Sequence, residues 1–547
     1  MRIYSILCLV FLFVYNSFAQ TGIIQGRVIN DKNNEPLEFA TVQIQGTSLG
    51  AKTSIEGAFT IKGIQPGFHK IVVSMVGFET KISEELQVLG NQTTFIDIMV
   101  SEASTTLREV FVSPNLLLRP TESPVSVLTL GVHQIEKSAG ANRDVSKLVQ
   151  ILPGVGATAP NRNDLIIRGG GPTENVFYLD GVEIPVINHF ATQGASGGVV
   201  GIINPDFVRE ISFYTGAFPA NRPNTLSSVM EIKQKDGSRD RLHTKVAVGA
   251  SDAGITLDGP LGKDASFIIS TRQSYLQWLF KVIGLPFLPT YNDFQLKYKW
   301  RINPYHEITM IGIGAIDNMR LNRNLEQTGT EAQKYLLSYL PEYSQWNYTF
   351  GLSYKHYGKR FVDSWILSRN MMRNGGVKYR DNDKSASKIS DYQSDEAEIK
   401  LRYERKYTTL PIKLNFGAGI KYSNYVNDVY RLQFISGNVV PFQYRSSIDL
   451  LSYQVFLQAS DQYLNNRFKI SLGVNLVGNT YTASMSNPLK QLSPRLSLSY
   501  SFSKDFDLNA NIGRYAMPPS YTTMGYRNSE GNYVNRSNAL KYITSNQ

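Results

Sequence analysis

Cysteine is almost absent from this chain of 547 residues, and the single one is Cys8. Cys8 lies in an apolar N-terminal segment. Since it is the only cysteine, the rest of the sequence has no thiol for disulfides, nucleophilic catalysis or metal ligation. The six histidines are scattered, and no His-Glu-x-x-His motif occurs. No nucleophile, base and orienting group stand out together. We therefore expect no catalytic residues, no metal site and no cofactor.

Long hydrophobic runs are also missing. A membrane helix needs about 20 apolar residues, and the longest apolar stretch, residues 3–14, is shorter. With Arg2 before it and the small residues Ser17 and Ala19 after it, this stretch predicts a signal peptide over residues 1–19. Any later crossing of a membrane would use strands.

Charged residues are scarce as well, at 18% of the chain, where about 25% is usual. The net charge of +11 is spread along the sequence, with no Lys/Arg block. This distribution gives no reason to expect a nucleic-acid partner. Aromatic residues are abundant instead, with 31 Tyr and 27 Phe, which suits a surface that faces lipid and its interfaces.

Short alternating strands with Asn, Asp, Gly and Pro turns predict a small antiparallel sandwich over residues 22–100. The segments Pro36-Leu37, Glu56-Gly57-x-Phe59, Pro66-Gly67 and Val76-Gly77-Phe78 resemble the carboxypeptidase-regulatory-like (prealbumin-like) domain. That resemblance implies a non-catalytic domain of the kind that commonly precedes outer-membrane receptors of Bacteroidota type, here on the periplasmic side.

Residues 101–120 form an expected linker, ending in a region rich in proline. Its core is β-prone and consists of Leu107, Arg108, Glu109, Val110, Phe111 and Val112. An extended strand of this kind can be captured by the sheet edge of a partner protein. The alternative is a strand that docks on the preceding sandwich.

Residues 121–235 combine a helical period with several short motifs. Apolar residues at three- and four-residue spacing predict a helix over residues 132–152, interrupted near Gly140. Then come Leu152-Pro153-Gly154-Val155, Ile167-Arg168-Gly169-Gly170, Asp180-Gly181-Val182 and a strand ending in Tyr214-Thr215-Gly216. The order of these motifs resembles the plug domain of TonB-dependent receptors. That resemblance implies an α+β plug inside a barrel.

Arg168, Gly169, Gly170, Asp180 and Gly181 form the core motif of the expected plug. We expect Arg168 to be a buried strand residue with a carboxylate partner, either within the plug (Asp180, Glu183) or at Glu231 or another acid of the barrel wall. A second candidate site is the polar, glycine-rich loop that contains Asn188, His189, Phe190 and Gln193. In the family such loops face the ligand; the alternative is a loop that contacts none.

Residues 236–547 alternate apolar and polar residues over long strands. In residues 413–422, Leu414, Phe416, Ile420 and Tyr422 share one face, and small or polar residues share the other. This pattern is typical of an antiparallel transmembrane β-barrel. We expect about twelve strands, whereas plugged transporters have about 22. The sequence is therefore expected to be a C-terminally truncated piece of a longer protein. The alternative is a small complete barrel, whose lumen could not hold the plug.

Taken together, these features predict a mainly β protein that resembles a TonB-dependent outer-membrane receptor. The resemblance implies import of a scarce nutrient, with the TonB-ExbB-ExbD complex as energy source and outer-membrane lipid and lipopolysaccharide as surroundings. We favour an iron-siderophore-type chelate slightly, because the chain is shorter than the large glycan importers. The alternatives are an oligosaccharide importer working with a surface lipoprotein, and a structural or adhesive cell-surface protein without transport.

Overall fold

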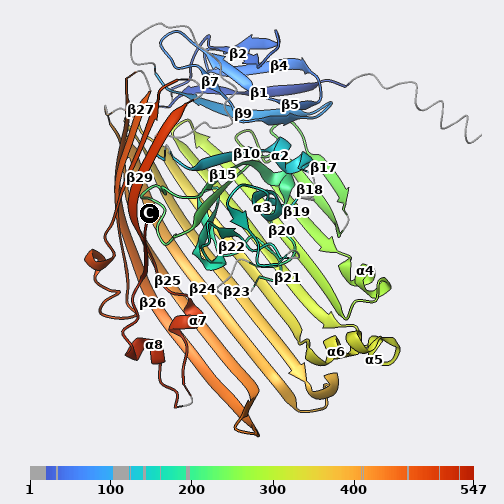
Figure 1. The fold of residues 1–547 in the computed structure, drawn as a ribbon. Coiled ribbons are helices and arrows are strands. Elements are labelled where there is room, and N and C mark those ends of the chain that lie inside the picture. The colour runs from blue at the N-terminus through green and yellow to red at the C-terminus, as the bar shows by residue number, and fades with distance from the viewer. Residues whose placement is uncertain are drawn as a thin grey trace, which may run out of the picture. The chain divides into compact units, whose positions relative to one another are not determined.

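A computed structural model describes residues 20–31, 35–102, 122–123, 125–138, 143–159, 162–191, 197–249, 251–407, 410, 412–464, 467–503, 506–528 and 530–547. The chain divides into two compact units, Met1–Phe111 and Val112–Gln547. Strands dominate both units (Figure 1). Within the described ranges, no helix is long and apolar enough to cross a membrane.

The first unit is a β-domain of three small sheets, ordered β4-β1-β9, β3-β2-β6-β7 and β5-β8. Its core contains the inward residues of these strands, such as Ile24, Val42, Ile61, Val73 and Ile98. The strands are β1 (Gly22–Asn30), β2 (Thr41–Ile44), β3 (Gly50–Lys52), β4 (Ala58–Ile64), β5 (Gly67–His69), β6 (Ile71–Ser74), β7 (Lys81–Ile82), β8 (Leu86–Val88) and β9 (Thr93–Val100).

One pairing in this β-domain differs from the expected antiparallel sandwich. Strands β1 and β9 run parallel, with Gln25 opposite Phe95 and Val28 opposite Ile98. A parallel pair needs a long crossover connection, and here the whole set β2–β8 forms that connection. Alternation within each strand cannot reveal the direction of its neighbour.

The plug begins the second unit and contains a five-stranded sheet ordered β10-β15-β16-β13-β14. The helix expected over residues 132–152, interrupted near Gly140, consists of two short helices on either side of that position; residues 139–142 between them lie outside the described residues. The Asp144 side chain begins the second helix by accepting hydrogen bonds from the backbone N–H of Ser146 at 2.8 Å and Lys147 at 3.3 Å. The elements are β10 (Val127–Gly131), α2 (Val132–Lys137), α3 (Val145–Gln150), β11 (Val155–Gly156), β12 (Ile166–Ile167), β13 (Asn175–Leu179), β14 (Val182–Ile184), β15 (Val208–Tyr214) and β16 (Ser228–Gln234).

The Asp-Gly motif of the plug is a two-residue turn between β13 and β14, where Leu179 pairs with Val182. Asp180 has φ 47° and Gly181 has φ 84°. Positive φ at both central residues matches the twist of a hairpin and favours Asp-Gly. The motif therefore forms the hairpin turn that its residue types predict.

A second, larger sheet surrounds the plug strands on one side (Figure 1). Among the described residues it has fourteen antiparallel strands in sequence order, and it is not closed. They are β17 (His243–Val248), β18 (Asp252–Pro260), β19 (Ala265–Ser274), β20 (Phe287–Asn303), β21 (His306–Leu321), β22 (Glu342–Tyr357), β23 (Phe361–Tyr379), β24 (Lys388–Tyr407), β25 (Lys413–Ile435), β26 (Asn438–Tyr463), β27 (Phe468–Asn479), β28 (Ser493–Ser501), β29 (Asp507–Met517) and β30 (Ile543–Asn546).

The expected number of about twelve strands was too low. Strand β17 is only six residues long, and β30 is only four residues long. Neither segment gives the long alternating pattern by which the other strands are recognised. The hydrogen-bonded register identifies them, since His243 pairs with Asp258 and Tyr515 pairs with Ser545.

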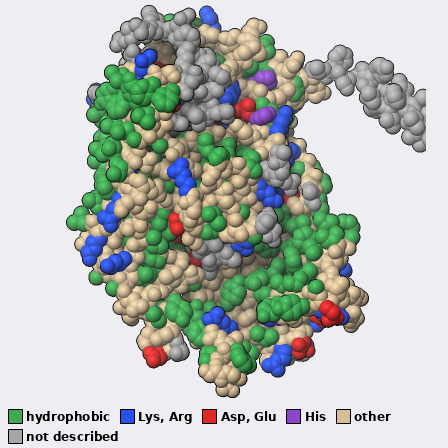
Figure 2. All heavy atoms as spheres, viewed as in Figure 1, with side chains coloured by type: hydrophobic (Ala, Val, Ile, Leu, Met, Phe, Trp, Pro, Cys, Tyr) green, Lys and Arg blue, Asp and Glu red, His purple; other side chains and the backbone are tan. Residues whose placement is uncertain are grey.

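The two faces of the large sheet differ as the alternation predicts. On the outer face, Ile420 is 53% exposed and Leu472 is 59% exposed. On the inner face, Gln295 and Ser471 are buried. Figure 2 shows hydrophobic side chains over the β27 and β29 edge and around helix α4 (Leu276–Val282). An apolar outer face with a polar inner face is the arrangement of a sheet that faces lipid.

Connections at the two ends of the large sheet have different lengths. At one end they are short, such as residues 304–305 and 358–360. At the other end several are long, such as residues 275–286 and 322–341, and these contain α4, α5 (Leu325–Thr328) and α6 (Glu331–Tyr339). Outer-membrane barrels have short turns on the periplasmic side and long loops outside the cell. The connection between β29 and β30 contains α7 (Tyr521–Met524) and α8 (Val534–Ser537).

The lipid-facing assignment predicts a depth-dependent cost of charge. Leu472→Arg lies within the apolar face of β27, and we expect it to lower the free energy of unfolding by about 2–4 kcal/mol in lipid vesicles. Tyr500→Arg, at the short-turn end of β28, is the matched control and should cost about 0–1 kcal/mol. Denaturant titration of both variants measures the difference. Equal costs would contradict the assignment.

Candidate functional site

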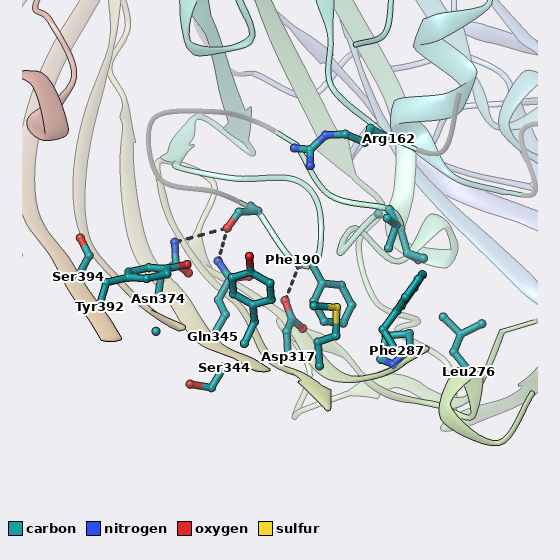
Figure 3. A pocket seen from close by; sticks show the side chains of 18 of the residues that line it. Arg162, Phe190, Leu276, Phe287, Asp317, Ser344, Gln345, Asn374, Tyr392 and Ser394 are labelled. Atoms are coloured by element: carbon teal, nitrogen blue, oxygen red, sulfur yellow. Dashed lines mark hydrogen bonds between the residues drawn. The ribbon is translucent and has the colours of Figure 1, made fainter. Parts of the chain in front are cut away.

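A large cavity lies at the long-connection end of the second unit, between the plug and the inner face of the sheet. Its volume is about 1170 Å³. The plug contributes Arg162 and Phe190, and the strand wall contributes Asp317, Asn374 and other inward residues (Figure 3). This volume lies slightly above the range of about 300–1,000 Å³ that is usual for small-molecule sites.

The floor of this cavity is the plug loop that contains His189, and a pair of wall aspartates holds it. The imidazole Nδ1 of His189 lies 2.7 Å from Asp317 Oδ1, and Nε2 lies 3.0 Å from Asp293 Oδ2. The backbone N–H of Phe190 donates to Asp317 Oδ2 at 2.7 Å. The imidazole ring of His189 also stacks on the ring of Tyr291, with centroids 4.2 Å apart. We call His189, Asp293 and Asp317 the histidine clamp.

Both ring nitrogens of His189 face carboxylate oxygens, so both donate only when the imidazole is protonated. Burial disfavours the charged form, but the carboxylates of Asp317 and Asp293 outweigh it and raise the pKa of His189 to about 9. All three clamp side chains are fully buried. The clamp is therefore a charged contact across the plug–wall boundary at neutral pH.

Arg272 of β19 extends the clamp to a second plug segment. Its guanidinium lies 2.9 Å from Asp293 Oδ2. The same group donates to the backbone carbonyls of Gly201 at 3.0 Å and Ile202 at 2.9 Å. One wall aspartate thus bridges a plug imidazole and a wall arginine, which fixes two plug loops against β19–β21.

Further ion pairs link the plug to the wall below the cavity. Asp180 Oδ2 lies 3.0 Å from Lys297 Nζ, and Glu183 Oε1 lies 2.7 Å from Lys400 Nζ. The guanidinium of Arg402 donates to the carbonyl of Gly181 at 2.6 Å. The hairpin turn at Asp180-Gly181 is therefore held on two sides by wall cations.

The expected role of Arg168 is wrong. Arg168 is exposed, and it follows β12 with φ 50° at the start of the glycine turn. It forms no ion pair with any residue that the structure describes. Positive φ at Arg168 and Gly169 reverses the chain before the arginine can enter the sheet. The next residue, Gly170, packs so closely that a Cβ would lie 1.7 Å from Ser227 Oγ.

Arg222 is the buried arginine with carboxylate partners that Arg168 was expected to be. Its Nε lies 2.6 Å from Glu231 in the plug, and its Nη1 lies 3.5 Å from Glu404 on β24. Although burial opposes the charge, these two carboxylates raise the pKa of Arg222. One sequence signal could have found it: Arg222 and Glu231 are the only charged residues between Ile211 and Ile232.

The predicted loop residues occupy different positions. Asn188 is buried inside the plug, where its Oδ1 accepts from Ser146 Oγ at 2.8 Å, and His189 is the buried clamp residue. Only Phe190 lines the cavity. Gln193 lies outside the described residues, as do the linker residues Leu107, Arg108, Glu109, Val110, Phe111 and Val112. The described part of the chain contains no cluster of His, Cys, Asp and Glu that could hold a metal ion.

The clamp predicts a pH dependence of stability. Because the pKa of His189 rises from 6.5 to about 9 on folding, its contribution of about 3 kcal/mol is present below pH 6.5 and is lost as pH rises through 9. His189→Gln should therefore reduce the free energy of unfolding strongly at pH 6 and weakly at pH 10. Asn204→Ala, which removes an uncharged plug–wall contact, is the control. A pH-independent effect of His189→Gln would refute the charged clamp.

Three family models match the sequence. A CarboxypepD_reg-like domain matches residues 24–112, a TonB-dependent receptor plug domain matches residues 119–224, and a TonB-dependent receptor-like β-barrel matches residues 281–547. No curated protein matches the chain.

Several solved receptor structures share the fold. A ferric enterobactin receptor of Pseudomonas aeruginosa is 15% identical with a TM-score of 0.55, covering 73% of this chain and 64% of its own. A siderophore receptor of Acinetobacter baumannii is 14% identical with a TM-score of 0.54, covering 73% and 62%. The protein FpvA of Pseudomonas aeruginosa, bound to a pyoverdine, is 13% identical with a TM-score of 0.53, covering 76% and 59%. This chain thus spans less than two thirds of these receptors.

The β-domain, the plug and the large antiparallel sheet follow one another in the same order as the three matched models. The chain belongs to the TonB-dependent receptors, with a carboxypeptidase-regulatory-like domain at its N-terminal side.

Proposed function

We propose that this protein imports a scarce nutrient across the outer membrane, and that the nutrient is an iron-siderophore-type chelate. The observation that carries the proposal is the cavity of about 1170 Å³ at the long-connection end, with the plug as its floor. A ligand in this cavity contacts both the plug and the wall at once. Its binding can therefore alter the contacts that hold the plug.

The charge of the cavity favours an anionic ligand. Its lining contains five cations (Arg143, Lys147, Arg162, Arg272 and Arg431) and three carboxylates (Asp144, Asp252 and Asp317). Each carboxylate already accepts hydrogen bonds from the protein. Among the described residues, neither Lys147 nor Arg431 pairs with a carboxylate. Cations with unused donors favour a negatively charged chelate.

Energy for uptake would come from the inner membrane, because the outer membrane has neither ATP nor an ion gradient of its own. We propose that the TonB-ExbB-ExbD complex pairs with the linker strand around residues 107–112 by strand addition. The β-domain would then be periplasmic, and the large sheet would lie in the outer membrane among lipid and lipopolysaccharide. Pulling on the linker would act on the plug directly, because the plug follows the linker in sequence.

An oligosaccharide is the second candidate, because aromatic side chains also line the cavity. They include Phe190, Tyr343, Tyr392, Tyr444 and Tyr526. Flat aromatic faces suit the apolar faces of sugar rings, and a surface lipoprotein partner would then cover the cavity. The unpaired cations distinguish the two candidates, because a neutral sugar gains little from them.

Linker removal tests the energy coupling. In cells, deletion of residues 107–113 should abolish uptake of radioiron-labelled ferric enterobactin and leave its surface binding unchanged, because the cavity is lined by residues from Arg143 onward. A variant with seven Gly and Ser residues in place of 107–113 separates loss of sequence from loss of length. Normal uptake by both variants would refute coupling through this segment.

The cavity cations test the ligand class. The double change Lys147→Gln and Arg431→Gln should weaken ferric enterobactin binding by about tenfold or more, with a smaller loss at high salt. The control is Lys334→Gln, because Lys334 lies on the exposed loop helix α6 and does not line the cavity. Isothermal titration of the purified protein measures both. An unchanged affinity for the chelate, together with binding of neutral oligosaccharides, would favour the second candidate.

A further inference from the structure

Three cavities follow one another along the inner face of the same wall strands, β23 to β25. Ser394 of β24 lines the large cavity, Glu396 lines a second cavity of about 220 Å³, and Lys400 lines a third of about 60 Å³. These side chains share one face of the strand because successive inward residues are two apart. The row of cavities therefore descends from the ligand cavity toward the short-turn end, between the plug and the wall.

The part of the wall formed by β19–β21, on the other side of β22, is sealed. On β19–β21, Gln295 accepts from the backbone N–H of Asn204 at 2.9 Å, and Asn204 Nδ2 donates to Ser270 Oγ at 3.0 Å. Ile311 and Ile313 of β21 belong to the same buried core cluster as the plug strands. The histidine clamp lies on this side as well. Opening a gap here would separate charged pairs, hydrogen bonds and apolar packing together.

On the hollow side, an apolar contact and two neutral hydrogen bonds to the Ala191 carbonyl, from Gln345 at 2.7 Å and Asn374 at 3.5 Å, lie between the first cavity and the second (Figure 3). Val186 and Ala191 of the plug pack against Met372 of β23. Ala191 lines the first cavity, whereas Val186 and Met372 line the second. No charged pair crosses this contact among the described residues. A shift of the plug loop that exchanges these two neutral hydrogen bonds for bonds to water would join the two cavities without separating an ion pair.

Below this contact the path is polar and charged. Glu398 accepts from Tyr521 at 2.6 Å and lies 2.7 Å from Lys400 and 3.0 Å from Lys421. Lys400 also pairs with Glu183 of the plug at 2.7 Å, and this pair, which lines the third cavity, must separate when the plug moves away from β24. Glu396 faces the same cavity, and it forms no hydrogen bond or ion pair with any described residue. Charges of both signs line this stretch, so it suits a hydrated polar solute rather than an apolar one.

We propose that imported solute passes the plug along β23–β25, with the contact of Val186, Ala191 and Met372 as the closed gate. This inference rests on the proposed import function and adds the side of the plug that opens. The plug stays seated on β19–β21 through the histidine clamp, while its contacts with β23–β25, including the pair of Glu183 with Lys400, open. The 220 Å³ cavity is too small for a bulky chelate, so the hollow side must widen during passage.

Two tethers test this route in the full chain. The pair Val186→Cys and Met372→Cys ties the plug to the hollow side, and the pair Asn204→Cys and Ser270→Cys ties it to the sealed side. Cys8 is the only native cysteine, so a short, reducible thiosulfonate cross-linker bridges the introduced thiols. We expect the first tether to lower uptake of radioiron-labelled ferric enterobactin by about tenfold or more, and the second to leave it within about twofold. Reduction should restore uptake and shows that the variant folds.

Other outcomes overturn the route. Block by the sealed-side tether alone would put the passage elsewhere, and block by both would mean that the whole plug must leave its seat. Block by neither would remove the gate. Absence of uptake in the wild type, with binding intact, would instead count against the proposed function.

A second measurement needs no cargo. Glu396→Cys should react faster with externally added sulfonated maleimide in energised cells than in cells treated with an uncoupler. Gln295→Cys, on the sealed side, is the matched control and should stay unreactive in both. Energy-dependent labelling of Gln295→Cys, with none at Glu396→Cys, would reverse the assignment of the two sides.

Discussion

Ionised groups buried between the plug and the wall are the constraint on which this structure depends. A buried charge is costly unless a partner compensates it, so each charge that the plug presents to the wall requires a group of opposite sign at one fixed position. His189 between Asp293 and Asp317, and Arg222 between Glu231 and Glu404, meet this requirement. Such pairs specify the position of the plug more than they add stability. They also allow movement, because charges released from the interface are stabilised by water.

The alternation of residues in the second half of the chain is enough to predict the large sheet and its lipid-facing side. Period two assigns each residue of a long strand to one face, and the exposed Ile420 and Leu472 follow that assignment. The hairpin at Asp180-Gly181 is equally predictable, because few residue pairs accept positive φ at both positions. Strands β17 and β30 escape prediction because they are short or poorly alternating. Only their hydrogen-bonded neighbours define them.

The plug–wall contacts cannot be predicted in the same way. His189 and Asp317 are separated by 128 positions in sequence, and their meeting depends on the rotation of the plug inside the sheet. No local pattern encodes that rotation. Two isoleucines before Arg168 favour a strand position for the arginine, but the backbone turns at Arg168 itself. Arg222, in a loop without periodicity, forms the ion pairs instead. A charged residue in an otherwise apolar segment is therefore a better predictor of a buried ion pair than a charged residue in a family motif.

The uneven distribution of contacts between the plug and the wall determines how the plug can move. The contacts on β19–β21 combine the clamp, neutral hydrogen bonds and apolar packing, so their separation would be cooperative and costly. On β23–β25 the charged groups Glu398, Lys400 and Lys421 already face cavities, and water can replace their partners with little loss. A pull on the segment before the plug would therefore separate the plug from the wall first where the interface is already hydrated. An interface that was uniformly tight would resist until the whole domain came free, whereas an uneven one can open on one side and return to its seat.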